Sequence, residues 1–285
     1  MIAFFEDIAI NPFLLTGLLA GVLASVACGV IGPFVITRRI VFLSGAIAHI
    51  ALAGIGAGIF LRYFYPEWFG WMSPLHGAVV VSLVSAVVLG LVHEKVAERM
   101  DTLIGAMWAV GMAVGLMLIK FTPGYHVELM SYLFGNITYV SWDSLWLLVG
   151  VDAVILLVTA VYYKQLLAVC VDAQQAALRG VPVLRVQIVL LCLVALTVIT
   201  LIQVVGLILV LALLTLPAAT ASHRLTRLSA VIPVSVLIGL LVTTVPRVVV
   251  YDLQVAGASI APEPAIVLAA AGVYLVSMGL KRVVG

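Results

Sequence analysis

The sequence contains very little charge. Of its 285 residues, 9% are Asp, Glu, Lys or Arg, whereas 65% are apolar, and the mean hydropathy is +1.32. Soluble domains usually carry roughly 25% charged residues, with which they cover their surface. A chain this poor in charge cannot form such a surface, and no polar stretch is longer than a short loop. We therefore expect an all-α integral membrane protein without a sizeable soluble domain. The net charge of +2 gives no reason to expect nucleic acid as a partner.

Cysteine pairs and enzyme motifs are also missing from the sequence. Cys28, Cys170 and Cys192 are scattered singly, with no CxxC or Cys/His pairing, so we expect packing residues rather than disulfides or metal ligands. There is no HExxH, GxSxG or nucleophile–base pair. The sequence therefore favours a protein that is not an enzyme and binds no cofactor. It also lacks a Walker A loop, so if ATP drives this protein, another chain must hydrolyse it. The first ten residues contain acids but no basic residue, unlike the start of a signal peptide.

Long apolar runs fill most of the chain. Crossing a hydrocarbon layer of about 30 Å takes about 20 helical residues. The run 183–222 has about 40 residues and would form a single helix of roughly 60 Å, twice that thickness. We expect it to fold back near Gln203–Gly206, which gives nine membrane helices, and a single span, giving eight, is the alternative. The nine expected spans are 13–37, 40–61, 75–92, 102–121, 143–163, 183–203, 204–222, 228–246 and 264–280.

The positions of the basic residues favour nine spans. With nine, only Arg62, Lys120 and Arg247 of the 14 Lys and Arg residues face outward. With eight, every loop after the run 183–222 changes side and more basic residues face outward. Because basic residues accumulate in cytoplasmic loops, the first arrangement is preferred. It places the N-terminus outside a bacterial-type inner membrane and the C-terminus in the cytoplasm. Arg247–Pro262 then forms an outer loop.

The stretch Cys170–Arg185 interrupts the apolar sequence and predicts a short helix outside the membrane. Asp172 suits its N-terminus, where a carboxylate accepts hydrogen bonds from free backbone N–H groups. Gly180 and Pro182 are typical of a helix end. Small residues at i, i+3, i+4 and i+7 form one smooth face, to which a partner's backbone could come close. They are Ala173, Ala176, Ala177 and Gly180. A plain interfacial loop helix is the alternative.

Two ionisable residues lie well inside predicted spans, where such groups are costly and therefore candidates for function. His49 is about nine residues into its span, near the bilayer midplane, where transporter sites commonly lie. Imidazole is a common ligand of zinc and other transition metals. Asp152, some ten residues into its own span, is a weaker candidate ligand. The alternatives are a histidine that is hydrogen-bonded to a neighbouring helix and an aspartate that caps a polar group of a partner helix. Small residues around His49 would let helices pack closely or line a narrow pathway.

Several segments together resemble one family. Arg38 and Arg39 precede AHIALAGIGAGI, and MDTLIGAMWAVGMAVGL, VELMSYLFGN, GLILVLALLTLPAATASHRLTR and VYLVSMGLKR follow at the expected places. Over nearly its whole length the chain resembles the zinc/manganese-type metal permeases of ABC importers. The resemblance implies the ABC importer permease fold, a single transmembrane domain over residues 1–285 and a role for 170–185 as the cytosolic coupling helix.

The same resemblance implies a function and a set of partners. The expected function is ATP-driven import of a divalent metal ion, zinc or manganese with iron as a further candidate, from an extracytoplasmic metal-binding protein into the cytoplasm. The expected partners are a second permease copy, two cytosolic ABC ATPase subunits, that binding protein and membrane lipid. An ATP-independent secondary transporter or channel is the alternative, and an intramembrane enzyme is disfavoured because no companion residues accompany His49 and Asp152.

The chain departs from the family pattern at two acidic positions. Relatives commonly carry Asp four residues before the histidine that matches His49, where both side chains would share a helical face, and this chain has Gly45. Asp also often follows the Leu-Phe-Gly motif, where this chain has Asn136. These replacements leave the identity of the metal open. His126 and Glu128 on the outer side could compensate near the entrance, and a solvated loop pair is the alternative.

Overall fold

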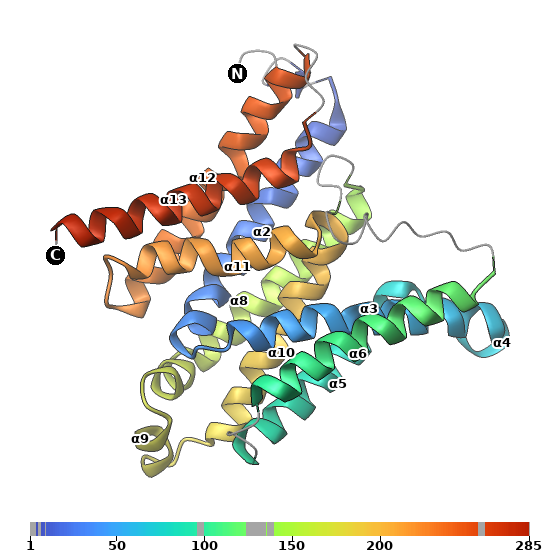
Figure 1. Ribbon diagram of the computed structural model, residues 1–285, viewed down its shortest axis with the longest axis horizontal. Helices are drawn as coiled ribbons and strands as arrows, with labels where there is room; N and C mark the ends of the chain where they lie inside the picture. Colours follow the sequence, from blue (N-terminus) through green and yellow to red (C-terminus); the bar gives the residue numbers. More distant parts are fainter. Residues whose placement is uncertain are drawn as a thin grey trace. The chain divides into compact units, whose positions relative to one another are not determined.

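The computed structural model describes residues 4, 7–8, 10–95, 100–123, 135, 140–255 and 260–284, and within these ranges it is helical, with no strand. The expected all-α fold is confirmed (Figure 1). Its helices are α2 (Pro12–Thr37), α3 (Val41–Phe64), α4 (Pro66–Phe69), α5 (Pro74–Lys95), α6 (Met100–Phe121), α8 (Trp142–Val171), α9 (Ala173–Leu178), α10 (Val183–Val205), α11 (Leu207–Ser222), α12 (Leu228–Val255) and α13 (Pro262–Val284).

The apolar helices coincide with the predicted spans. In the described part of the chain, eight helices are long and apolar enough to cross a membrane, and α11 is a shorter apolar helix of 16 residues. At 1.5 Å per residue α11 measures roughly 24 Å, somewhat less than the hydrocarbon layer. The described residues therefore contain eight helices of full spanning length and a ninth, shorter apolar helix.

The run 183–222 breaks where the sequence predicts. Gly206 separates α10 from α11 and has a φ of 83°, a left-handed conformation that glycine adopts without a steric penalty. Its N–H still donates to the carbonyl of Ile202 at 3.0 Å, and its own carbonyl accepts from the N–H of Val210 at 3.1 Å. Both helix ends thus keep their hydrogen bonds around a sharp turn, which is visible in Figure 1.

Two helices extend well beyond their predicted ends. α8 was expected to end at 163 but continues to Val171. Arg247 was expected to begin an outer loop, but α12 continues through it to Val255, with Pro246 tolerated inside the helix. The Arg247 side chain is 4% exposed and interacts electrostatically with Glu263 in the first turn of α13. An arginine that has an acidic neighbour can lie inside a protein of this kind, so its charge alone did not mark a loop.

The chain forms two compact units. The first comprises Met1–Thr37, Met130–Val161 and Thr200–Gly285. In it α2 packs on α12 and α11, and α11 also contacts α13. Small residues allow this packing, because a Cβ added at Gly29 would come within 2.6 Å of Val236. Ser25 and Thr243, from α2 and α12, also share a hydrogen bond of 3.1 Å.

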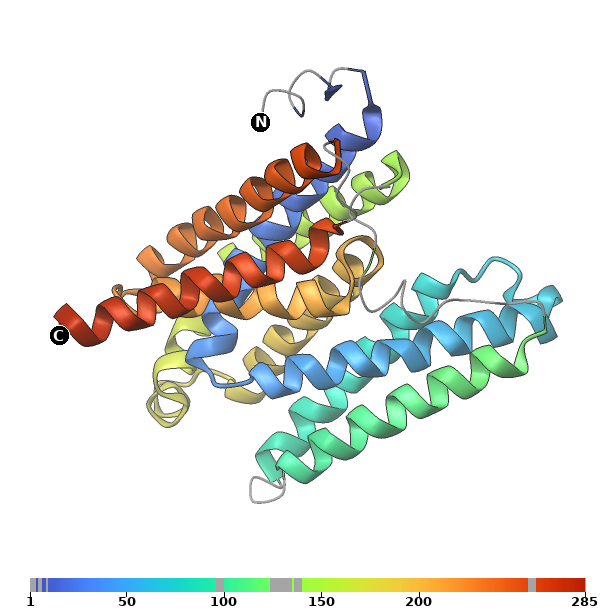
Figure 2. The same cartoon turned by 45° about the horizontal axis from the view of Figure 1, so that its top comes forward.

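The second unit comprises Arg38–Leu129 and Tyr162–Ile199. In it α3 packs along both α5 and α6, and these three helices lie side by side in Figure 2. A Cβ added at Gly54 would come within 2.6 Å of Ala78 on α5, and one at Gly56 within 2.5 Å of Gly115 on α6. The expectation that small residues around His49 permit close helix packing is confirmed, and α3 is largely buried as a result.

Candidate functional site

His49 lies in the middle of α3 and is only 6% exposed. Its Nδ1 is 2.8 Å from the carbonyl oxygen of Gly45, one turn earlier. A carbonyl oxygen can only accept a hydrogen bond, so Nδ1 carries the proton. In the neutral ring the lone pair is then on Nε2, and the hydrogen bond of Nδ1 is the one found for this ring among the described residues. This is the arrangement by which proteins orient a histidine for a metal ion, with one nitrogen bonded to the backbone and the other free to ligate.

Trp108 of α6 lies against the His49 ring. The two ring centroids are 4.3 Å apart and the planes are inclined by 39°. A Cβ added at Gly45 would meet only Trp108, at an ordinary contact distance of 3.9 Å. Position 45 therefore has room for a side chain next to His49. In this chain an indole occupies that neighbourhood instead of a carboxylate.

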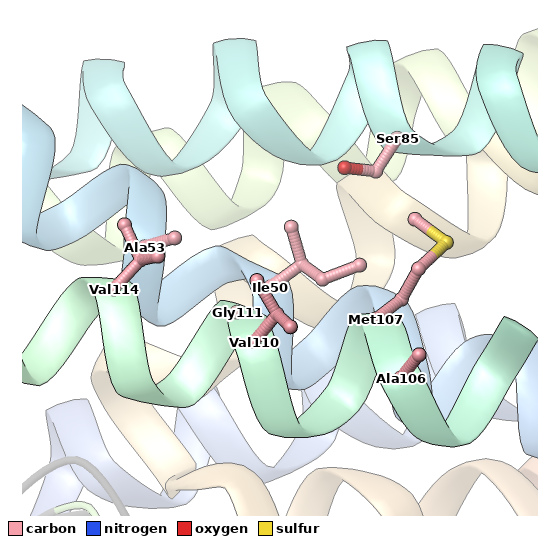
Figure 3. Close-up of a pocket in the computed structure, with 8 residues that line it drawn as sticks. All are labelled: Ile50, Ala53, Ser85, Ala106, Met107, Val110, Gly111 and Val114. Atoms are coloured by element: carbon pink, nitrogen blue, oxygen red, sulfur yellow. The ribbon is translucent and has the colours of Figure 1, made fainter.

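An apolar groove begins one residue beyond His49. Its volume is about 360 Å³, and side chains from α3, α5 and α6 surround it, as Figure 3 shows. They are Ile50, Ala53, Ser85, Ala106, Met107, Val110, Gly111 and Val114. The hydroxyl of Ser85 donates to the carbonyl of Val81 at 2.7 Å. The groove lining therefore offers a metal ion no charged ligand. On α3 the candidate metal ligand is His49, which precedes the groove residue Ile50.

Asp152 lies on α8 in the first unit and is 5% exposed. Among the described residues its Oδ2 has no hydrogen-bond partner, so no polar group capped by this oxygen is found there. Asp152 lies near Cys28 of α2, a buried cysteine that forms no disulfide. His49 belongs to the second unit, so the two candidate ligands lie in different units. Within the described ranges no three His, Cys, Asp or Glu side chains gather closely enough to hold a metal ion. His126, Glu128 and Asn136 lie outside those ranges.

The predicted helix outside the long spans is present as α9. Asp172 is its N-cap, and its Oδ1 accepts from the backbone N–H groups of Gln174 at 2.9 Å and Gln175 at 3.0 Å. Gly180 follows the helix with a φ of 79°. The N–H of Val181 donates to the carbonyl of Ala176, and the N–H of Gly180 to that of Ala177, which together form a Schellman motif. Both predicted helix-end signals are confirmed.

Only part of the small-residue face of α9 is exposed to a partner protein. Ala176 is 2% exposed, so its methyl group faces the interior of the chain, and the expectation that it lies on an open face with the other small residues is wrong. The helical period placed it on that face correctly, but tertiary packing covers this position. Ala177 and Gly180 remain exposed, and Ala173 is half-buried. Leu178, which the pattern of small residues omitted, is 88% exposed.

Sequence reasoning also missed one polar contact. Nη2 of Arg38, just before α3, donates to Oε1 of Gln187 on α10 at 3.1 Å. Gln187 is 1% exposed. The signal was present in the sequence, since Gln187 is an isolated amide in the apolar run that forms α10, and such a group needs a hydrogen-bond partner.

Comparison with known proteins decides the family. The model of the ABC 3 transport family matches residues 11–281. The chain belongs to the ABC 3 transport family. It is 38% identical to an uncharacterized membrane protein of Synechocystis, over 95% of this chain and 91% of that one. It is also 30% identical to the manganese transport system membrane protein MntC of Halalkalibacterium halodurans, over 90% and 85% of the two chains.

A solved structure has the same fold as this ABC 3 family member. A chain of PsaBC from Streptococcus pneumoniae, determined in complex with Fab, aligns with a TM-score of 0.82 and 29% identity, covering 98% of this chain and 95% of that one. The resemblance to metal permeases of the manganese and zinc type is confirmed. This ABC 3 family member is a multi-pass membrane permease of the metal-transporting ABC type.

Proposed function

We propose that the chain is the membrane subunit of an ATP-driven importer for a divalent metal ion, zinc or manganese with iron as a further candidate. It accepts the ion from an extracytoplasmic binding protein and releases it into the cytoplasm. Two copies of the chain form the pathway, and two cytosolic ABC ATPase subunits supply the energy. The N-terminus is outside and the C-terminus is cytoplasmic, as the distribution of basic residues favours.

The geometry of His49 carries this proposal. The Nδ1–Gly45 hydrogen bond fixes the ring, and Nε2 keeps its lone pair in the middle of a buried membrane helix. Imidazole suits zinc and also binds other first-row divalent ions. No acid stands beside it at position 45, so the contact with the ion is weak and transient. A permease must release what it accepts, and such a contact meets that requirement. Asp152, whose buried Oδ2 has no hydrogen-bond partner among the described residues, is the second candidate contact for the cation.

The partner surface for the ATPase is α9. The helix is capped at both ends, and it exposes Ala177, Leu178 and Gly180. A leucine that is 88% exposed on a helix of six residues is suited to an apolar pocket of another protein. Asp172 contributes by holding the first turn, and Ala173 and Ala176 support the helix from its covered side.

Transport by the purified complex tests the proposal. The complex is isolated from its native membrane through a tag on this chain, reconstituted in liposomes, and supplied with radioactive zinc or manganese and the co-isolated metal-binding protein. We expect an ATPase to co-purify and uptake to require ATP hydrolysis. Uptake that proceeds equally well with a non-hydrolysable ATP analogue, driven by an ion gradient alone, would instead show a secondary transporter.

A further inference from the structure

Arg38 ties the start of α3 to α10. Its Nη2 donates to Oε1 of Gln187 over 3.1 Å, and Gln187 lies in the second turn of α10. The geometry requires this direction, because a guanidinium has only donors. Gln187 is 1% exposed, so the contact is enclosed by protein. Both residues belong to the second unit, together with α3 and α9.

On the α10 side, the connection to α9 is short and conformationally restricted. Only four residues, 179–182, separate the two helices. Gly180 closes α9 in a Schellman motif, and Pro182 has a fixed φ and accepts a hydrogen bond from the N–H of Val186 at 3.1 Å. A displacement of α9 therefore reaches the first turns of α10, where Gln187 lies, instead of being absorbed by a flexible loop.

On the other side, Arg38 is three residues before α3. Arg39, which lies between Arg38 and the start of α3, has a φ of 59°, a left-handed conformation that is uncommon for a residue other than glycine. The linker is thus held in one strained shape. His49 lies eight residues beyond Val41, the first residue of α3, or about 12 Å along the axis. Because α3 is a continuous, largely buried helix, movement at Arg38 is transmitted to His49.

The contact is incompletely satisfied in this structure. Nε of Arg38 and Nε2 of Gln187 are both buried, and neither has a hydrogen-bond acceptor among the described residues. Buried donors without acceptors are unfavourable and rare. A rearrangement of Arg38 and Gln187 that gave these donors acceptors would remove this cost. The contact therefore has a physical reason to change when the helices that carry it move.

We propose that Arg38 is a positioning residue which, through its bond to Gln187, links movement of α9 to the position of α3 and His49. The inference rests on the proposed function, because it assigns the step between the ATPase contact on α9 and the ion contact on α3. Arg38 touches neither the ion nor the ATPase in this account. Without Arg38, the ATPase should still hydrolyse ATP, but less ion should be transported for each ATP hydrolysed.

The test compares zinc uptake with ATP hydrolysis in the reconstituted complex. In Arg38→Gln and Gln187→Leu, we expect uptake per ATP hydrolysed to fall by about tenfold, within the range of known coupling effects, while ATP hydrolysis stays within about twofold. Gln187→Glu keeps an acceptor oxygen for Arg38 and should retain coupling. Arg39→Gln is the matched control, since it removes the neighbouring charge from an exposed side chain. It should leave the ratio unchanged.

Two results would overturn the inference. One is a wild-type ratio in both Arg38→Gln and Gln187→Leu. The other is a proportional loss of uptake and ATP hydrolysis, which would indicate a general structural defect. If Arg38→Gln does not assemble, the comparison of Gln187→Leu with Gln187→Glu decides. A wild-type complex that shows no ATP-dependent uptake would refute the proposed function itself. That outcome is distinct, because in the other two cases the wild-type complex still transports.

Discussion

Gly135 and Gly206 lie backbone against backbone. A Cβ added at Gly135 would overlap the amide nitrogen of Gly206 and the carbonyl carbon of Val205, at the turn between α10 and α11. Both glycines have positive φ, 69° at Gly135 and 83° at Gly206. The glycine of the Leu-Phe-Gly motif therefore has a physical reason, because only a residue without a side chain can lie this close to the backbone of Val205 and Gly206.

We predict that Gly135→Ala destabilises the permease. The added methyl group clashes with backbone, and the left-handed conformation alone costs about 1–2 kcal/mol for alanine. Thermal unfolding of the purified protein in detergent measures the effect. Gly150→Ala is the control, since a Cβ added at Gly150 on α8 would meet nothing within 4 Å. Equal melting temperatures for Gly135→Ala and the wild type would contradict the backbone contact.

Two substitutions on α9 should have different effects, one on ATPase binding and the other on the stability of the permease. Leu178 is 88% exposed, so Leu178→Arg should leave the permease folded but reduce the amount of ATPase that co-purifies with it. Ala176 is 2% exposed, and Ala176→Arg must bury a long charged side chain, which we expect to lower stability by more than about 2 kcal/mol. Pull-down and thermal unfolding of the two variants provide the comparison. Undiminished ATPase recovery with Leu178→Arg would argue against α9 as the contact.

The topology predicts which exposed positions face the cytoplasm. Ser229, at the start of α12, should be cytoplasmic, and Ala261, before α13, should be external. In a variant lacking the three native cysteines, an impermeant thiol reagent added to intact cells should label Ala261→Cys and spare Ser229→Cys. Permeabilised cells, in which both should react, provide the control. The reverse pattern would mean that the termini have the opposite orientation.

The sequence predicts the helices well because the membrane imposes length and hydropathy on them. Gly206 could be identified as the break, since the run 183–222 is too long for one helix. Asp172 and Gly180 identified α9 because cap chemistry is local. Burial is not local, so the covered position of Ala176 and the helical position of Arg247 were not foreseen.

The candidate site was predictable only in part. His49 is conspicuous in an apolar span, and its residue type already suggests a metal ligand. Its orientation depends on a hydrogen bond to Gly45 within the helix, and its neighbour Trp108 comes from a different helix. The Arg38–Gln187 contact joins residues far apart in the chain. No short-range pattern encodes such pairs, because they depend on how the helices pack.

The measurement that tests the central claim most directly is the initial rate of zinc and manganese uptake by cells producing His49→Ala. Loss of the only imidazole in the middle of α3 should reduce uptake by at least about tenfold, the scale on which metal-site substitutions act. His76→Ala, which changes an exposed histidine bonded to Ser73, is the matched control and should transport normally. At equal amounts of protein in the membrane, His49→Ala uptake at the wild-type rate for both metals would contradict the account.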